Sequence, residues 1–125
     1  MRSDAFRAAA EAKDFSAAED LFTEDVSFRS PVVYRPYEGR ETLMVLLGAV
    51  AQVFEDFRYV EQVESGDAAV LMFEARAGER DLQGVDILRF DGEGKIREMV
   101  VMVRPLSGVQ ALAEEMQRRL EAAAG

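Results

Sequence analysis

The chain has 125 residues, 49% of them apolar and 31% charged, with a formal net charge of −9 and neither cysteine nor histidine. This composition is typical of one globular domain. Without cysteine the chain can form no disulfide and no thiolate. Without histidine it lacks the commonest metal ligand and the commonest general base. The negative charge also argues against nucleic acid or an anionic membrane as a partner.

The N-terminal part of the chain predicts two short helices. The Ala-rich segment 3–12 has Phe6 as its only large apolar side chain and favours a helix capped by one of its first polar residues. A second helix is expected from Ser16, which has capping-box spacing to Glu19, and residues 23–25 end it.

The middle of the chain predicts a strand, an irregular segment and the longest helix. The strand covers 26–30, and Pro31 and Pro36 bracket the segment that follows, which cannot be an inner strand throughout because proline donates no ladder hydrogen bond. Gly39 precedes a helix over 40–54, in which leucine, valine and phenylalanine recur at helical spacing. Such an apolar stripe packs on a sheet.

Four strands and a last helix complete the predicted order. Apolar and polar residues alternate with a period of two in the strands, which are joined by glycine-containing turns in the manner of a meander. The expected strands are 57–64, 69–77, 84–90 and 96–103, and an amphipathic helix follows Pro105. The order of elements indicates an α+β fold, a bent antiparallel sheet with helices on one face.

The last two predicted strands carry the most informative pattern. Asp86 shares one strand face with Leu88 and Phe90, so a carboxyl lies among apolar side chains. The return strand is apolar on both faces, and such a strand is normally covered on both. Strict alternation puts Met99, Val101 and Val103 on one face and Ile96, Val100 and Met102 on the other.

The segments LFTEDVSF, SPV, EGRETL and GVDILRFDGEGKI, in this order, make the chain resemble the nuclear transport factor 2-like superfamily, which includes SnoaL-like proteins and ketosteroid isomerases. The resemblance implies a single domain, 1–125, with a cone-shaped, cystatin-like fold. In that fold a curved antiparallel sheet is wrapped by the N-terminal helices and one long helix around an apolar pocket, with a C-terminal helix. The opposite sheet face often forms a dimer, so we expect a homodimer.

The resemblance also allows single residues to be compared. Ketosteroid isomerases use a tyrosine in the first helix, a base aspartate before the first proline and a protonated aspartate in the G-x-D strand. These positions fall at Phe6, Ser30 and Asp86. A serine without a nearby histidine or lysine cannot abstract a carbon-bound proton at neutral pH, so we predict no ketosteroid isomerisation. A limonene epoxide hydrolase would need an aspartate near Val101, whereas a SnoaL-type cyclase would need Asp86 or Glu74 as its acid.

Three functions stay open. The first is a small-molecule-binding protein whose apolar pocket takes a ligand with one polar group. The second is an isomerase, cyclase or lyase with Asp86 as catalytic acid, and the third is a homodimeric interaction module without catalysis. The expected ligand contacts are Asp86, Leu88, Ser30, Phe6, Tyr34, Tyr59 and Phe73, with Tyr37 as a further phenol donor.

No metal, cofactor or membrane partner is expected. No apolar run approaches the roughly 20 residues that span a bilayer, and the N-terminus does not resemble a signal peptide, so we expect a cytoplasmic protein. For Asp86 the apolar neighbours favour a neutral carboxyl with a raised pKa, whereas Arg76 or Arg104 could instead pair with it. We expect the neutral acid, because an apolar cone suits a hydrogen-bond donor better than an ion pair.

Overall fold

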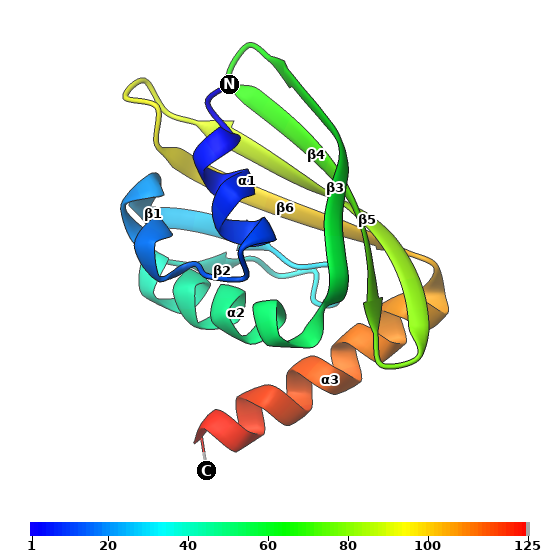
Figure 1. Ribbon diagram of the computed structural model, residues 1–125. Helices are drawn as coiled ribbons and strands as arrows, with labels where there is room; N and C mark the ends of the chain where they lie inside the picture. Colours follow the sequence, from blue (N-terminus) through cyan, green and yellow to red (C-terminus); the bar gives the residue numbers. More distant parts are fainter. Residues whose placement is uncertain (125) are drawn as a thin grey trace.

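The computed structural model describes residues 1–124, and Figure 1 shows their arrangement. The elements are α1 (Asp4–Glu11), the 3₁₀ helix η1 (Ser16–Leu21), β1 (Phe22–Arg29), β2 (Tyr37–Glu38), α2 (Arg40–Val53), β3 (Glu55–Ser65), β4 (Ala68–Ala77), β5 (Arg80–Phe90), β6 (Ile96–Arg104) and α3 (Leu106–Ala124). Most of them lie within two residues of their predicted bounds. The exceptions are the starts of β1 and β5, each four residues early, and β2, which is too short to show a periodic pattern. Residues 80 and 81, expected in the turn before β5, already belong to that strand.

The six strands form one sheet in the order β2-β1-β6-β5-β4-β3. Strands β3 to β6 are the predicted antiparallel meander. The sheet is not antiparallel throughout, because β1 pairs with β6 in parallel. A long connection separates these two strands in the chain, and only such a crossover allows parallel pairing. The α+β class and the curved sheet are as predicted.

The helices pack on the concave face of the sheet. In Figure 1 the sheet bends around α1 and α2, while α3 starts beside the β4–β5 turn and crosses the end of the sheet. Helix α2 buries Leu43 and Leu47 against this face, and β4 contributes Leu71 and Phe73 from it. Each such side chain contributes roughly 1.5–3 kcal/mol when it is fully buried. The predicted apolar stripe of the long helix is therefore the seam between helix and sheet.

A β-bulge changes the faces of β6. Arg89 pairs with Glu98, but its neighbour Phe90 pairs with Ile96, so one residue of β6 is extra. Ile96 and Met99 therefore both point inward, with 2% and 3% exposure. The prediction that Ile96 lies opposite Met99 is wrong, because alternation does not carry across a bulge.

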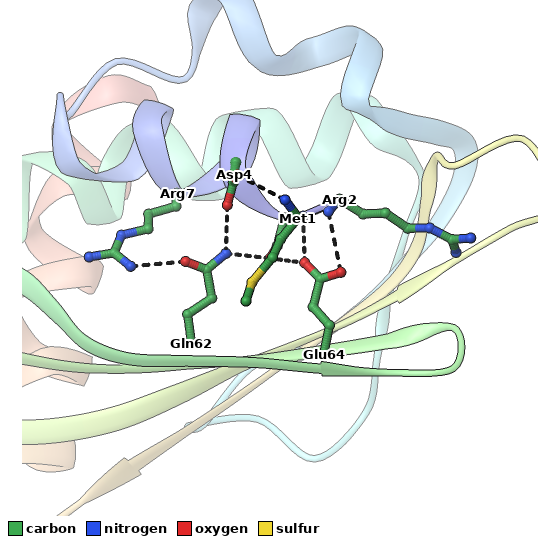
Figure 2. A network of polar contacts seen from close by, with 7 residues as sticks. Met1, Arg2, Asp4, Arg7, Gln62 and Glu64 are labelled. Carbon is green, nitrogen blue, oxygen red and sulfur yellow. Dashed lines mark hydrogen bonds and ion pairs between the residues drawn. The ribbon is translucent and has the colours of Figure 1, made fainter.

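The start of α1 is fixed to β3 by a polar network (Figure 2). The Glu64 carboxylate accepts hydrogen bonds from the backbone N–H groups of Arg2 and Ser3, at 3.2 and 2.9 Å, and from the Ser3 hydroxyl. Gln62 donates to the Ser3 hydroxyl at 2.7 Å and accepts from Arg7 at 2.9 Å. Ser3 makes no capping bond within its own helix. Glu64, from another element, binds the backbone directly before the helix, which holds α1 over the sheet.

Candidate functional site

The concave face of the sheet and the three α-helices enclose a cavity of about 560 Å³. Its wall is mainly apolar and includes Phe28, Leu47, Phe54, Phe57, Met99 and Met116. An apolar cavity of this size, with a small number of polar groups, is the usual form of a small-molecule site.

One buried polar pair interrupts the apolar wall. The Tyr59 hydroxyl on β3 lies 2.5 Å from Oδ2 of Asp86 on β5. Both residues are buried, with 6% and 5% exposure. The Tyr59 ring meets Phe57 and Phe73 edge-on, at centroid distances of 4.9 and 6.3 Å. The Arg7 guanidinium of α1 lies 5.8 Å from the centroid of the same ring. These contacts fix the phenol, and through it the carboxyl.

Burial raises the pKa of Asp86 to about 7, and the hydrogen bond with Tyr59 opposes the shift. Burial, together with the Asp86 carboxylate, also raises the pKa of the Tyr59 phenol. Within residues 1–124 no arginine bonds to Asp86: Arg76 pairs with Asp56 at 2.6 Å, and Arg104 bonds to Gln83 at 3.4 Å. The expectation that no arginine pairs with Asp86 is confirmed, and burial shifts the pKa of Asp86 in the expected direction.

Asp86 can therefore present either of two groups to the cavity at neutral pH. As a neutral acid it can donate a hydrogen bond, and as a carboxylate it can only accept. Oδ2 is bonded to Tyr59, whereas Oδ1 has no hydrogen-bond partner in the described part of the chain. Because Asp86 lines the cavity, Oδ1 is available to a ligand.

The predicted contact residues divide into two groups. Asp86, Tyr59, Ser30 and Phe6 line the cavity, whereas Leu88, Phe73 and Tyr34 do not. Leu88 and Phe73 are in the core at 0% and 1% exposure, and Tyr34 is 94% exposed. Leu88 shares a strand face with Asp86, but the core covers that part of the face. Strand alternation predicts on which side of the sheet a side chain lies, but it does not predict how far a cavity extends along that side.

Ser30 has a local role in the loop after β1. Its hydroxyl accepts hydrogen bonds from the backbone N–H groups of Val32 and Val33, at 3.2 and 2.9 Å, which closes a tight turn. Its own proton is directed at the Val33 carbonyl, 3.4 Å away. Ser30 therefore organises the cavity rim, and among residues 1–124 its hydroxyl bonds to backbone groups and to no basic side chain.

Several lining residues were not predicted, because they come from α3 and from the end of α1. Leu112, Met116 and Leu120 of α3 line the cavity together with polar residues at its rim. Their helical spacing was visible in the sequence, but the surface they face depends on the packing of α3. At the rim, Lys13 donates to the Phe54 carbonyl at 2.7 Å.

A cone of curved sheet and helices around an apolar cavity is the architecture of nuclear transport factor 2-like proteins. The family model for the SnoaL-like domain matches residues 4–99, and the chain belongs to this family.

Solved structures share the fold along nearly the whole chain. A steroid delta-isomerase from Pseudomonas aeruginosa is 43% identical with a TM-score of 0.95, covering 98% of this chain and 91% of that chain. An uncharacterised protein with a cystatin-like fold from Silicibacter pomeroyi DSS-3 is 34% identical with a TM-score of 0.91. The match covers 95% of this chain and 84% of that chain. A putative SnoaL-like polyketide cyclase from Jannaschia sp. CCS1, at 12% identity and a TM-score of 0.70, covers 86% of each chain and shares the fold alone. A search of the curated proteins finds no match.

Among residues 1–124 no helix is both long and apolar enough to cross a membrane. The same residues contain no group of three or more acidic side chains placed to hold a metal ion.

Proposed function

We propose that the protein binds an apolar small molecule that carries a polar group, and that this group contacts Asp86. The observation that carries the proposal is a free carboxyl oxygen at the wall of an apolar cavity of about 560 Å³. A ligand that completes a hydrogen bond to this oxygen in an apolar cavity gains about 0.5–1.5 kcal/mol.

The polar group of the ligand is a hydroxyl or a carbonyl. A hydroxyl donates to the ionised Asp86, whereas a carbonyl accepts from the neutral acid. Because the pKa of Asp86 is about 7, both forms are populated near neutral pH. The apolar body of the ligand fills the space between α2, α3 and the sheet.

The test compares trans-4-hydroxystilbene with trans-stilbene in fluorescence titrations. The wild-type protein should bind the hydroxylated compound roughly twofold to tenfold more tightly, because one hydrogen bond is added. Asp86→Leu should remove this preference, since leucine has a similar volume and no hydrogen-bonding group. Met102→Leu, on the opposite sheet face, is the matched control and should keep it. Equal affinity of the wild type for both compounds would contradict the proposed role of Asp86.

A second candidate function is an isomerase, cyclase or lyase reaction with Asp86 as general acid. Two observations favour it: a pKa of about 7 suits an acid that works near neutral pH, and a solved structure described as a steroid delta-isomerase is 43% identical.

For ketosteroid isomerisation itself we expect no meaningful turnover of a β,γ-unsaturated ketosteroid. Ser30 stands where a base is needed and its hydroxyl is bound within the loop, and loss of a positioned base typically removes about 10²–10⁴ of rate. The measurement is the absorbance of the conjugated product, with Asp86→Asn as the control for background. Wild-type turnover at the rate of an authentic isomerase would show that the comparison of residues is wrong.

A further inference from the structure

We propose that the cavity has a second polar contact, the phenol of Tyr37, and that its ligand is an elongated apolar molecule with a hydrogen-bonding group at each end. The inference rests on the proposed binding function and specifies the class of ligand. It follows from the polar groups that line the cavity and from the register of the sheet.

Tyr37 differs from the other polar residues of the wall. Every other polar lining side chain has a hydrogen-bond partner in the protein: Lys13 bonds to the Phe54 carbonyl, Ser30 bonds within its loop, Gln117 donates to Glu121, and Tyr59 bonds to Asp86. The Tyr37 hydroxyl has none among the residues that the structure describes. Tyr37 is half-buried, so its hydroxyl takes its hydrogen bond from solvent or from a ligand. A ligand in the cavity can supply it.

The ring of Tyr37 is held in place. Tyr37 pairs with Phe28 across β2 and β1, and the two rings stack with centroids 6.2 Å apart and an interplanar angle of 28°. Both residues line the cavity. A fixed ring directs its hydroxyl without the loss of side-chain freedom that a mobile residue would incur on binding.

The sheet register gives the separation of the two polar contacts. Tyr37, Phe28, Met99 and Leu88 form one cross-strand row, and Asp86 lies two residues from Leu88 on the same face. Three strand steps of about 4.8 Å and two residues of about 3.3 Å put the two backbone positions about 16 Å apart along the sheet. Both residues line the cavity from the concave side of the curved sheet, so their polar atoms lie closer together than the two backbone positions do.

This separation selects the class of ligand. A compact molecule with one polar group reaches Asp86 or Tyr37, but not both. A rigid, extended molecule with a hydroxyl or carbonyl at each end reaches both, and its apolar body then lies across Phe28 and Met99. Water at the Tyr37 hydroxyl would satisfy the same group but would give no preference for such a molecule.

The experiment uses trans-4,4′-dihydroxystilbene against trans-4-hydroxystilbene, titrated by fluorescence into the wild-type protein, Tyr37→Phe and Tyr34→Phe. The wild type should bind the dihydroxylated probe roughly twofold to tenfold more tightly, the gain of one neutral hydrogen bond. Tyr37→Phe should remove that preference. Tyr34→Phe should keep it, because Tyr34 is 94% exposed and lies outside the cavity.

The remaining outcomes separate this inference from the proposed function. Equal binding of the two probes by the wild type, with the Asp86-dependent preference for 4-hydroxystilbene over stilbene intact, would overturn the role of Tyr37 alone. A preference that persists in Tyr37→Phe would assign the second contact to another group and also overturn it. Failure of every stilbene to bind would overturn the binding function and this inference together.

Discussion

The Asp86 carboxyl links the cavity to the stability of the fold. Its folded pKa of about 7 lies above the value of about 3.9 for an exposed aspartate. Between these values the unfolded chain is ionised while the folded protein still holds the proton, so the folded state binds more protons. The contribution of Asp86 to the free energy of unfolding should therefore fall as pH rises from about 4 to 7, on the order of 1 kcal/mol for each pH unit, and then level off.

Urea denaturation at pH 4.5 to 8 measures this dependence, with Asp86→Asn as the comparison. The asparagine variant should show a flatter curve, because the buried group no longer ionises. The chain contains no histidine, so no other side chain has an ordinary pKa between about 5.5 and 8, and the comparison with Asp86→Asn removes the contribution of the glutamates near pH 4.5. A wild-type curve that rises with pH would contradict a neutral buried acid.

The position of Asp86 could be predicted from the sequence, but its partner could not. The alternation of β5 is regular, so the local pattern alone identifies the face of Asp86. Tyr59 reaches it from β3, across the intervening strand β4, and bulges shift the register of β3 on both sides of Tyr59. Pattern analysis does not detect such bulges, because each changes the pairing without changing the type of residue.

At the scale of elements, the β4–β5 hairpin depends on a close approach at Gly84. A Cβ there would lie 2.5 Å from Cζ of Phe73 and 2.6 Å from the Met102 carbonyl oxygen. Gly84→Ala should therefore destabilise the protein by about 1–3 kcal/mol, the usual cost of overpacking. Gly48→Ala is the control: nothing lies within 4 Å of its Cβ position in α2, and alanine favours a helix, so stability should rise by about 0.5–1 kcal/mol. Denaturation midpoints measure both, and a neutral Gly84→Ala would disprove the packing argument.

The helices and meander strands were predictable because each has its own periodicity in the sequence. The parallel pairing of β1 with β6, the two-residue β2 and the packing of α3 were not predictable in this way. Each depends on contacts between segments far apart in the chain, which a local pattern does not contain. For the same reason the sequence indicates Tyr37 only as a phenol donor. Its place at the end of the cross-strand row that leads to Leu88 depends on strand pairing, which the local pattern does not show.

For the whole molecule, we propose a homodimer formed through the outer face of the sheet. Two cross-strand rows on this face are largely apolar: Val63, Val70, Ile87 and Val100 in one, and Met72, Val85 and Met102 in the other. Val63 and Met102 are 53% and 56% exposed. Charged pairs border the rows, Arg58 with Glu74 at 2.9 Å on one side and Arg89 with Glu98 at 3.6 Å on the other. An apolar centre with a polar rim is the anatomy of a protein interface.

Light scattering at micromolar concentration should give twice the 13.9 kDa mass of one chain. Met102→Lys should shift the protein towards monomer, since a charge in the centre of the interface must be desolvated. Val45→Lys is the control and should stay dimeric, because Val45 is 57% exposed on α2, which packs on the concave face. A stable interface buries roughly 1,200–2,000 Å² in total. A 13.9 kDa species for the wild type at every concentration would refute the dimer.

The two ends of the sheet restrict how copies of the chain can join. One edge is β2, only two residues long, and the other is β3, which is interrupted by bulges and carries charged side chains. Short, bulged and charged edges offer few free backbone groups in line, so they are poor templates for an incoming strand. Ribbon-like growth from edge to edge, the first step towards a cross-β fibre, is therefore disfavoured at both ends. In the proposed dimer, by contrast, two copies meet face to face and cover each other's outer sheet face.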